Sequence, residues 1–163
     1  MSVRANLKQE LLTVWNGSPW YGSSSHHILE GVTAAEAAAR PVAGVQSIWE
    51  IVLHMVAWTE EAASRVKGAR AKLPARGDWP VPPADAADAS WVNTQQELLA
   101  ARTALLDAVE ASHEEDLYLL VPSAAGSAGP TFSRAATAGG LAEHDIHHLG
   151  QLSLLKRAAR APR

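Results

Sequence analysis

The chain has 163 residues, of which 47% are hydrophobic and 19% are charged, a balance typical of one globular domain that spans residues 1–163. Its net charge of −3 argues against nucleic acid as a partner, since that needs a concentrated basic surface, and the absence of cysteine excludes disulfides and thiolate ligands. No stretch approaches the roughly 20 apolar residues of a membrane span and no signal-peptide pattern opens the chain, so we expect no membrane partner and a cytoplasmic location.

The N-terminal part of the chain predicts one long helix followed by short helical pieces. Residues 3–16 carry an apolar stripe at spacings of three and four, formed by Val3, Leu7, Leu11, Val14 and Trp15. Glycine and proline end this helix, and residues 23–31 are long enough for a short helical turn. Thr33 followed by Glu36 predicts a capping box that opens another short helix, which Pro41 stops.

The middle of the chain predicts two long helices separated by an irregular segment. The first covers about 46–67, ends at Gly68, and has a core stripe of Ile48, Ile51, Met55, Trp58 and Ala62. Several prolines exclude regular helix over 69–89, so this is a long connection. Ser90 is then expected to cap a third helix over about 91–112.

The last helix is expected to begin within 133–141 and to end near residue 160, because two consecutive glycines blur its start. Four long helices predict an all-α four-helix bundle with a short helical insert after the first helix. The connections at 69–89 and 113–132 are long enough to be crossover connections, so simple up-down-up-down order is not required.

Histidines mark the core-facing side of the last helix, in the sequence LAEHDIHHLGQ (141–151). His144 and His148 are four residues apart, so their imidazoles lie on one helix face about one turn apart and can converge on one metal ion. Gln151 falls on the same stripe, whereas His147 falls at its rim. Imidazoles in an apolar stripe are costly unless their nitrogens find partners, which makes ligation or hydrogen bonding necessary.

His54, on the inward side of the second long helix, is the candidate for a third ligand. Glu50 and Glu61 lie on its polar side and, together with Gln151, are candidate hydrogen-bond partners that orient the metal-binding imidazoles. A bundle that packs this helix against the last one brings three imidazoles to one point. The alternative is that all three histidines are hydrogen-bonded core residues without a metal.

Three stretches carry a resemblance to a known family: SIWEIVLHMVAW (47–58), HDIHHLGQLSLLKR (144–157) and PWYGSSSHHILEGVTAAEAAARP (19–41). With them the chain resembles the DinB-like family of metal-dependent four-helix-bundle proteins, a superfamily that includes bacterial thiol-dependent transferases. The resemblance implies a bundle with crossover connections, a homodimer, and a divalent metal, nickel or zinc, on three histidines. Carried over by motif, the metal ligands are His54, His144 and His148. In relatives an aromatic residue often stands where this chain has His147.

Three functions are compatible with these residues. The first is a metal-dependent enzyme, a thiol-dependent transferase or a hydrolase, with an open coordination position for a small-molecule substrate and a low-molecular-weight thiol as second cofactor. The second is a non-catalytic metal-binding stress or sensor protein with a closed site. The third is an apo helical dimer with core histidines. Four side chains are expected to line the entrance of an open site: Trp20, Tyr21, Trp58 and His147.

Overall fold

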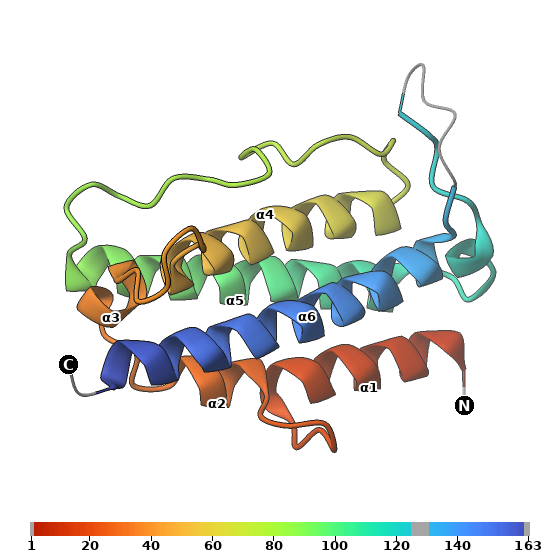
Figure 1. The fold of residues 1–163 in the computed structure, drawn as a ribbon. Helices are drawn as coiled ribbons and strands as arrows, with labels where there is room; N and C mark the ends of the chain where they lie inside the picture. The colour runs from red at the N-terminus through yellow and green to blue at the C-terminus, as the bar shows by residue number, and fades with distance from the viewer. Residues whose placement is uncertain (1, 125–130, 162–163) are drawn as a thin grey trace.

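The computed structural model describes residues 2–124 and 131–161, and these residues form the predicted all-helical bundle (Figure 1). The four long helices are α1 (Val3–Asn16), α4 (Ile48–Val66), α5 (Asp88–Ala111) and α6 (Arg134–Arg160). The short elements are α2 (Ser25–Leu29), α3 (Ala34–Ala38) and the 3₁₀ helix η1 (Glu115–Tyr118). Among the helices described, none is long and apolar enough to cross a membrane.

The helices do not follow simple up-down order. Helices α4 and α5 run in the same direction, and α1 and α6 run in the opposite one (Figure 1). The chain therefore returns along the length of α4 through residues 67–87 before α5 begins, which makes the first long connection a crossover. The second, over 112–133, joins neighbouring ends of antiparallel helices. Its residues 125–130 lie outside the described part of the chain.

Side-chain caps fix where most of these helices begin. The predicted Thr33 capping box is present at α3, and Ser47 forms a second one with Glu50 at the start of α4. Ser133 caps α6, which continues through the two glycines without a break. The predicted cap at Ser90 is wrong, because α5 begins at Asp88 and the Ser90 hydroxyl bonds a carboxylate of the preceding loop instead.

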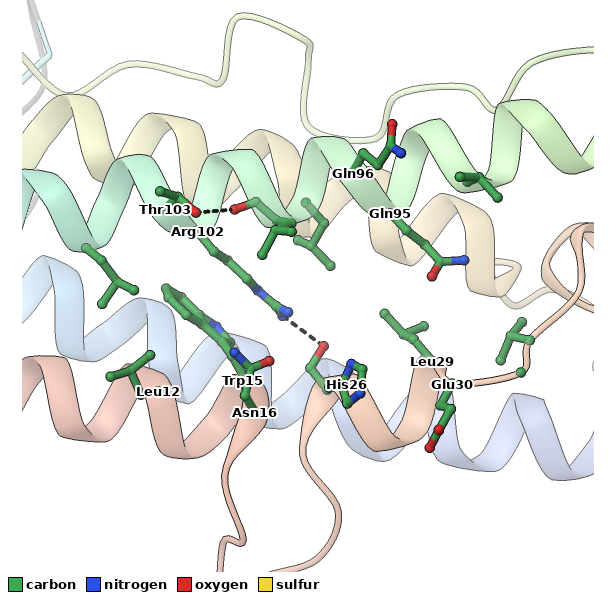
Figure 2. A pocket seen from close by; sticks show the side chains of 17 residues that line it. Leu12, Trp15, Asn16, His26, Leu29, Glu30, Gln95, Gln96, Arg102 and Thr103 are labelled. Atoms are coloured by element: carbon green, nitrogen blue, oxygen red, sulfur yellow. Dashed lines mark hydrogen bonds between the residues drawn. The ribbon is translucent and has the colours of Figure 1, made fainter.

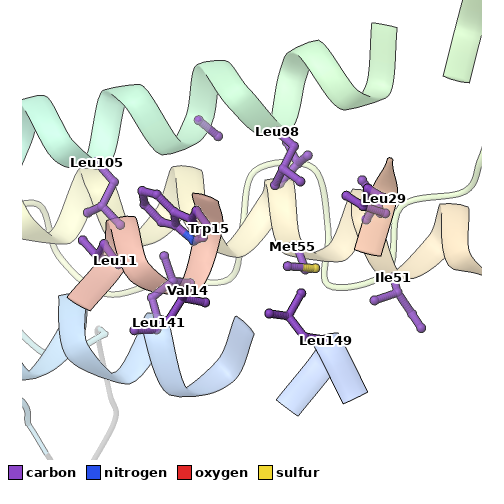
Figure 3. Packing of buried hydrophobic residues seen from close by; sticks show 14 of the residues in the cluster. Leu11, Val14, Trp15, Leu29, Ile51, Met55, Leu98, Leu105, Leu141 and Leu149 are labelled. Atoms are coloured by element: carbon purple, nitrogen blue, oxygen red, sulfur yellow. The ribbon is translucent and has the colours of Figure 1, made fainter. Parts of the chain in front are cut away.

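The core lies between the four long helices and is filled by large apolar side chains (Figure 3). Its largest fully buried members include Trp15, Trp49, Leu11, Met55, Leu105 and Leu152. Burying each such side chain contributes about 1.5–3 kcal/mol. Helix α4 packs against both α5 and α6, so its inward face holds the polar His54 against the histidines of α6.

Candidate metal centre

Three imidazoles meet at the seam between α4 and α6. The Nε2 atom of His144 lies 3.0 Å from Nε2 of His54 and 3.2 Å from Nε2 of His148. One nitrogen from each ring can be chosen so that all lie within 4.8 Å of one another. Two ligands about 2.1 Å from one ion lie roughly 3.0–3.4 Å apart at octahedral or tetrahedral angles, so the spacing suits a single divalent ion.

In two of these rings, the hydrogen bond made by Nδ1 indicates which ring nitrogen carries the proton. Nδ1 of His54 donates to the backbone carbonyl oxygen of Asp78 at 2.6 Å, and a carbonyl oxygen can only accept. Nδ1 of His148 lies 2.7 Å from the amide oxygen of Gln151. In a neutral ring this leaves Nε2 as the acceptor. The Nε2 atoms of His54 and His148 therefore both point unshared electron pairs at Nε2 of His144. A proton on Nε2 of His144 can be donated to only one of them at a time, whereas a cation can be bound by all three nitrogens.

Burial keeps the rings of His148 and His54 neutral. Loss of solvent lowers the pKa of His148 to about 4, although its hydrogen bond to Gln151 acts in the opposite direction. Burial also lowers the pKa of His54, against the opposing hydrogen bond to Asp78. A neutral imidazole is the form that binds metal, so little competition from protons is expected near neutral pH.

The crossover segment closes one side of the site. The indole of Trp79 stacks on the ring of His54, with centroids 3.9 Å apart and planes tilted by 13°. Trp58 donates from Nε1 to the Asp78 carboxylate at 2.8 Å, which ties the segment to α4. Sequence reasoning missed Asp78 and Trp79, because an irregular proline-rich segment has no periodicity that would assign them a face. A tryptophan beside a carboxylate there was the only available signal.

The two glutamates proposed as partners of the imidazoles have other contacts. Both Glu50 oxygens are engaged, one by the backbone N–H of Ser47 in the capping box and one by Arg40. Glu61 accepts from Arg65 at 2.9 Å and from the backbone N–H of Lys72 at 3.0 Å. Seven residues, about 10 Å along the helix, separate Glu61 from the His54 ring that it was expected to orient.

A groove beside His144 supplies access to the site. It has a volume of about 610 Å³, and its lining includes Trp58, Arg65, Phe132 and the glycines at 139 and 140. A β-carbon built on Gly140 would meet nothing within 4 Å, so the missing side chain leaves this part of the groove open. The side chain of His144 is 29% exposed, which makes it the ligand that faces this space.

The other predicted entrance residues lie outside the groove lining. Trp20 is 95% exposed, and His147 is exposed with its Nε2 3.2 Å from the Gln151 amide nitrogen. Burial raises the pKa of the Tyr21 phenol, and the charge of Glu10, a residue of the groove lining, adds to this effect. Of the four, only Trp58 lines the groove.

A second hollow, of about 390 Å³, lies between α1, α2 and α5 (Figure 2). Its floor is the buried guanidinium of Arg102, which donates to the Ser25 hydroxyl at 2.9 Å and to the Asp145 carboxylate at 3.2 Å. Burial lowers the pKa of Arg102, and the neighbouring Asp145 charge opposes that shift. Asp145 itself comes from α6 and is fully buried.

A known family matches the part of the chain that carries these histidines. A family model described as the DinB superfamily matches residues 23–152, a range that contains all three histidines, Gln151 and the crossover segment. Searches of curated proteins and of solved structures gave no significant match. Since the match covers well over half of the sequence, the chain belongs to the DinB superfamily.

Proposed function

We propose that this protein binds one divalent metal ion through His54, His144 and His148 and uses it in a reaction on a small molecule. The observation that supports the proposal is the convergence of three Nε2 atoms, with 3.0 and 3.2 Å between neighbouring pairs. Two of these rings donate from Nδ1 to fixed acceptors, so their Nε2 atoms offer only electron pairs. Without an ion, Nε2 of His144 can donate a proton to only one of these two atoms at a time, so the other electron pair has no partner within the cluster.

Nickel or zinc is the proposed metal, since imidazole ligands suit both. When bound by three imidazoles with a further position open, such an ion lowers the pKa of a coordinated water or thiol toward neutrality. The chain has no cysteine, so a thiol nucleophile would come from a low-molecular-weight thiol. The proposed reaction is therefore a thiol-dependent transfer or a hydrolysis.

The chain's own residues would supply orientation and shelter. The groove beside His144 is large enough for a small organic substrate, and Trp58 and Phe132 offer it apolar contact. Trp79 and Asp78 cover His54 from the other side, which leaves the His144 side as the route of approach. An approach from one side only limits water at the reacting atoms.

Metal binding is tested with two adjacent histidines. His148→Ala should weaken zinc and nickel binding by more than the roughly 100-fold that loss of an orienting partner can cost. His147→Ala is the matched control, because this neighbouring ring is exposed and its nitrogen contacts the Gln151 amide rather than the other imidazoles, so its loss should cost far less affinity. Equal losses in both variants, or no loss in either, would contradict the assignment; competition with a chromophoric chelator measures it.

The reaction is tested separately with metal-loaded protein. Low-molecular-weight thiols with electrophilic acceptors, and simple esters and amides, form the substrate panel. Turnover should disappear on chelation and return with metal. Gly140→Trp, which fills the groove from a position with open space, should lower turnover while metal affinity stays the same. Turnover that survives chelation would refute a metal-dependent reaction, and metal binding without turnover on any substrate would favour a sensor or storage role.

A further inference from the structure

His144 differs from the other two histidines in what its Nδ1 contacts. Nδ1 of His54 and of His148 each have an acceptor, whereas Nδ1 of His144 is buried and has no hydrogen-bond partner. Oδ1 of Asp145 is also buried without a partner, and the two atoms are 3.7 Å apart. Buried polar atoms without partners are rare because each costs free energy. Here a potential donor and a potential acceptor face each other.

The Asp145 carboxylate is held in place by its other oxygen. Oδ2 accepts from the indole Nε1 of Trp15 at 2.7 Å and from Nη2 of Arg102 at 3.2 Å. Both donors come from other helices of the core, α1 and α5, and the carboxylate has no exposed surface. The anchoring of Oδ2 leaves Oδ1 free of bonds and directed toward the ring of the preceding residue.

We infer that Asp145 is a positioning residue of the metal centre, with Oδ1 accepting the Nδ1 proton of His144 and so presenting Nε2 of that ring to the ion. The inference rests on the proposed metal binding. A hydrogen bond needs the 3.7 Å gap to close by about 1 Å, and the partly exposed imidazole has room to turn. Each ligand would then have an acceptor at Nδ1: a backbone carbonyl, an amide oxygen and a carboxylate.

Asp145→Asn separates this role from a packing role. Trp15 and Arg102 can only donate toward the anchored position, so the amide oxygen of the asparagine must occupy it. The amide NH₂ then faces Nδ1 of His144 and donates to it. The imidazole proton is thereby forced onto Nε2, the atom that would bind the metal, and the ring can no longer act as a ligand.

The experiment compares zinc affinity, by chelator competition, in wild type, Asp145→Asn and Leu105→Ala. Because the His144 ring is lost as a ligand, Asp145→Asn should weaken zinc binding by more than the roughly 100-fold that loss of an orienting partner alone can cost. Leu105→Ala is the control for lost core stability, since Leu105 is fully buried on α5, and it should retain wild-type affinity. The cobalt-substituted Asp145→Asn protein should also show the weaker visible absorption expected for loss of one imidazole.

Nitrogen NMR of the zinc-loaded wild type covers the case in which Asp145→Asn fails to fold. His144 should be protonated at Nδ1, with a slowly exchanging proton. Protonation of His144 at Nε2, or wild-type zinc affinity in folded Asp145→Asn, would overturn the role of Asp145 while leaving metal binding intact. A wild-type protein that binds no divalent ion would instead overturn the proposed function and this inference with it.

Discussion

The groove beside His144 and the hollow above Arg102 are two openings of one bundle, and they differ in how their polar groups are matched. The groove, of about 610 Å³, ends at His144, whose Nε2 faces the acceptor nitrogens of both His54 and His148. The hollow, of about 390 Å³, ends at the Arg102 guanidinium, whose charge is paired with Asp145 and whose Nη2 donates to Ser25 and Asp145, although its Nε is buried without a partner. Space alone does not distinguish them. Two acceptor nitrogens that converge on His144 make the first a candidate site, whereas the paired charges make the second part of the core.

Adjacent residues of α6 connect the two regions. His144 faces the groove and Asp145 faces Arg102, because successive residues on a helix point about 100° apart. The carboxylate therefore serves two neighbours: Oδ2 balances the buried guanidinium, and Oδ1 lies nearest the imidazole. The comparison predicts that stability and metal affinity can be changed independently from the two ends of this contact.

The largest effect is expected at the Arg102 end. Arg102→Met leaves the Asp145 carboxylate buried without a charge partner, so the free energy of unfolding should fall by about 3–5 kcal/mol. Urea denaturation of the apo protein measures this. Gln96→Ala provides a control on the lining of the same hollow, and a surface substitution of that kind should stay within about 0.5 kcal/mol of wild type.

The double variant Arg102→Met with Asp145→Leu makes the comparison sharper. Replacing both charges with apolar groups should recover part of the lost stability, since buried pairs contribute little beyond their own desolvation, but the buried Trp15 N–H loses its acceptor. Zinc affinity should not recover, because Nδ1 of His144 would lack an acceptor. A double variant that regains both properties would show that Asp145 matters to the site only through folding.

A smaller effect is expected at the groove end, at Gln151. Gln151→Ala removes the acceptor of Nδ1 in His148 and should weaken zinc binding roughly 10- to 100-fold. Glu61→Gln should leave the affinity unchanged, because the Glu61 carboxylate contacts Arg65 and the Lys72 backbone rather than a ring. The reverse result, with loss in Glu61→Gln alone, would mean that the helices shift when metal binds. Isothermal titration of both variants distinguishes the two cases.

Helical periodicity was enough to predict most of the fold. The stripe at spacings of three and four located α1 at Val3–Asn16, and the Thr33–Glu36 pair located the start of α3. The same periodicity placed the three histidines inward, and the structure brings them together. Periodicity could not predict where α5 begins. Ser90 favours an N-cap by residue type, but its hydroxyl bonds Asp85 instead, and the helix begins without a side-chain cap.

The surroundings of the imidazoles were less predictable. Trp79 and Asp78 reach His54 from an irregular crossover, and no periodic pattern assigns such a segment to a helix face. Angular arithmetic also ignores displacement along the axis, which is why Glu61 was expected near His54. Asp145 was overlooked for a related reason: its value as a partner depends on Trp15 and Arg102, which are distant in sequence.

The smallest effect concerns the rim of the hollow and depends on pH. Arg160, near the end of α6, donates to both oxygens of Glu36 and also to the backbone carbonyl of Gly31, a residue that lines the hollow. The hydrogen bonds from Arg160 and from the Thr33 backbone lower the pKa of Glu36 from 4.5 to about 2. The folded protein therefore holds this carboxylate ionised more strongly than the unfolded chain does.

The sign of the pH dependence follows from that difference. A carboxylate with a lowered folded-state pKa stabilises the fold fully above pH 4.5, and this contribution is lost as the pH falls from 4.5 to about 2. Glu36→Gln keeps an amide oxygen for the capping bond but removes the charge, so it should lower stability at neutral pH and lose its effect near pH 2. Urea denaturation of the apo protein across this range measures the difference.

Two controls separate the charge of Glu36 from its packing. In the Glu36→Gln variant, the further change Arg160→Gln should have little effect on the free energy of unfolding at acid pH. Zinc affinity should stay the same, because Arg160 contacts Glu36 and the Gly31 carbonyl at the rim of the hollow, away from the imidazoles. A stability difference that stays constant down to pH 2 would show that the loss arises from packing rather than from the charge of Glu36.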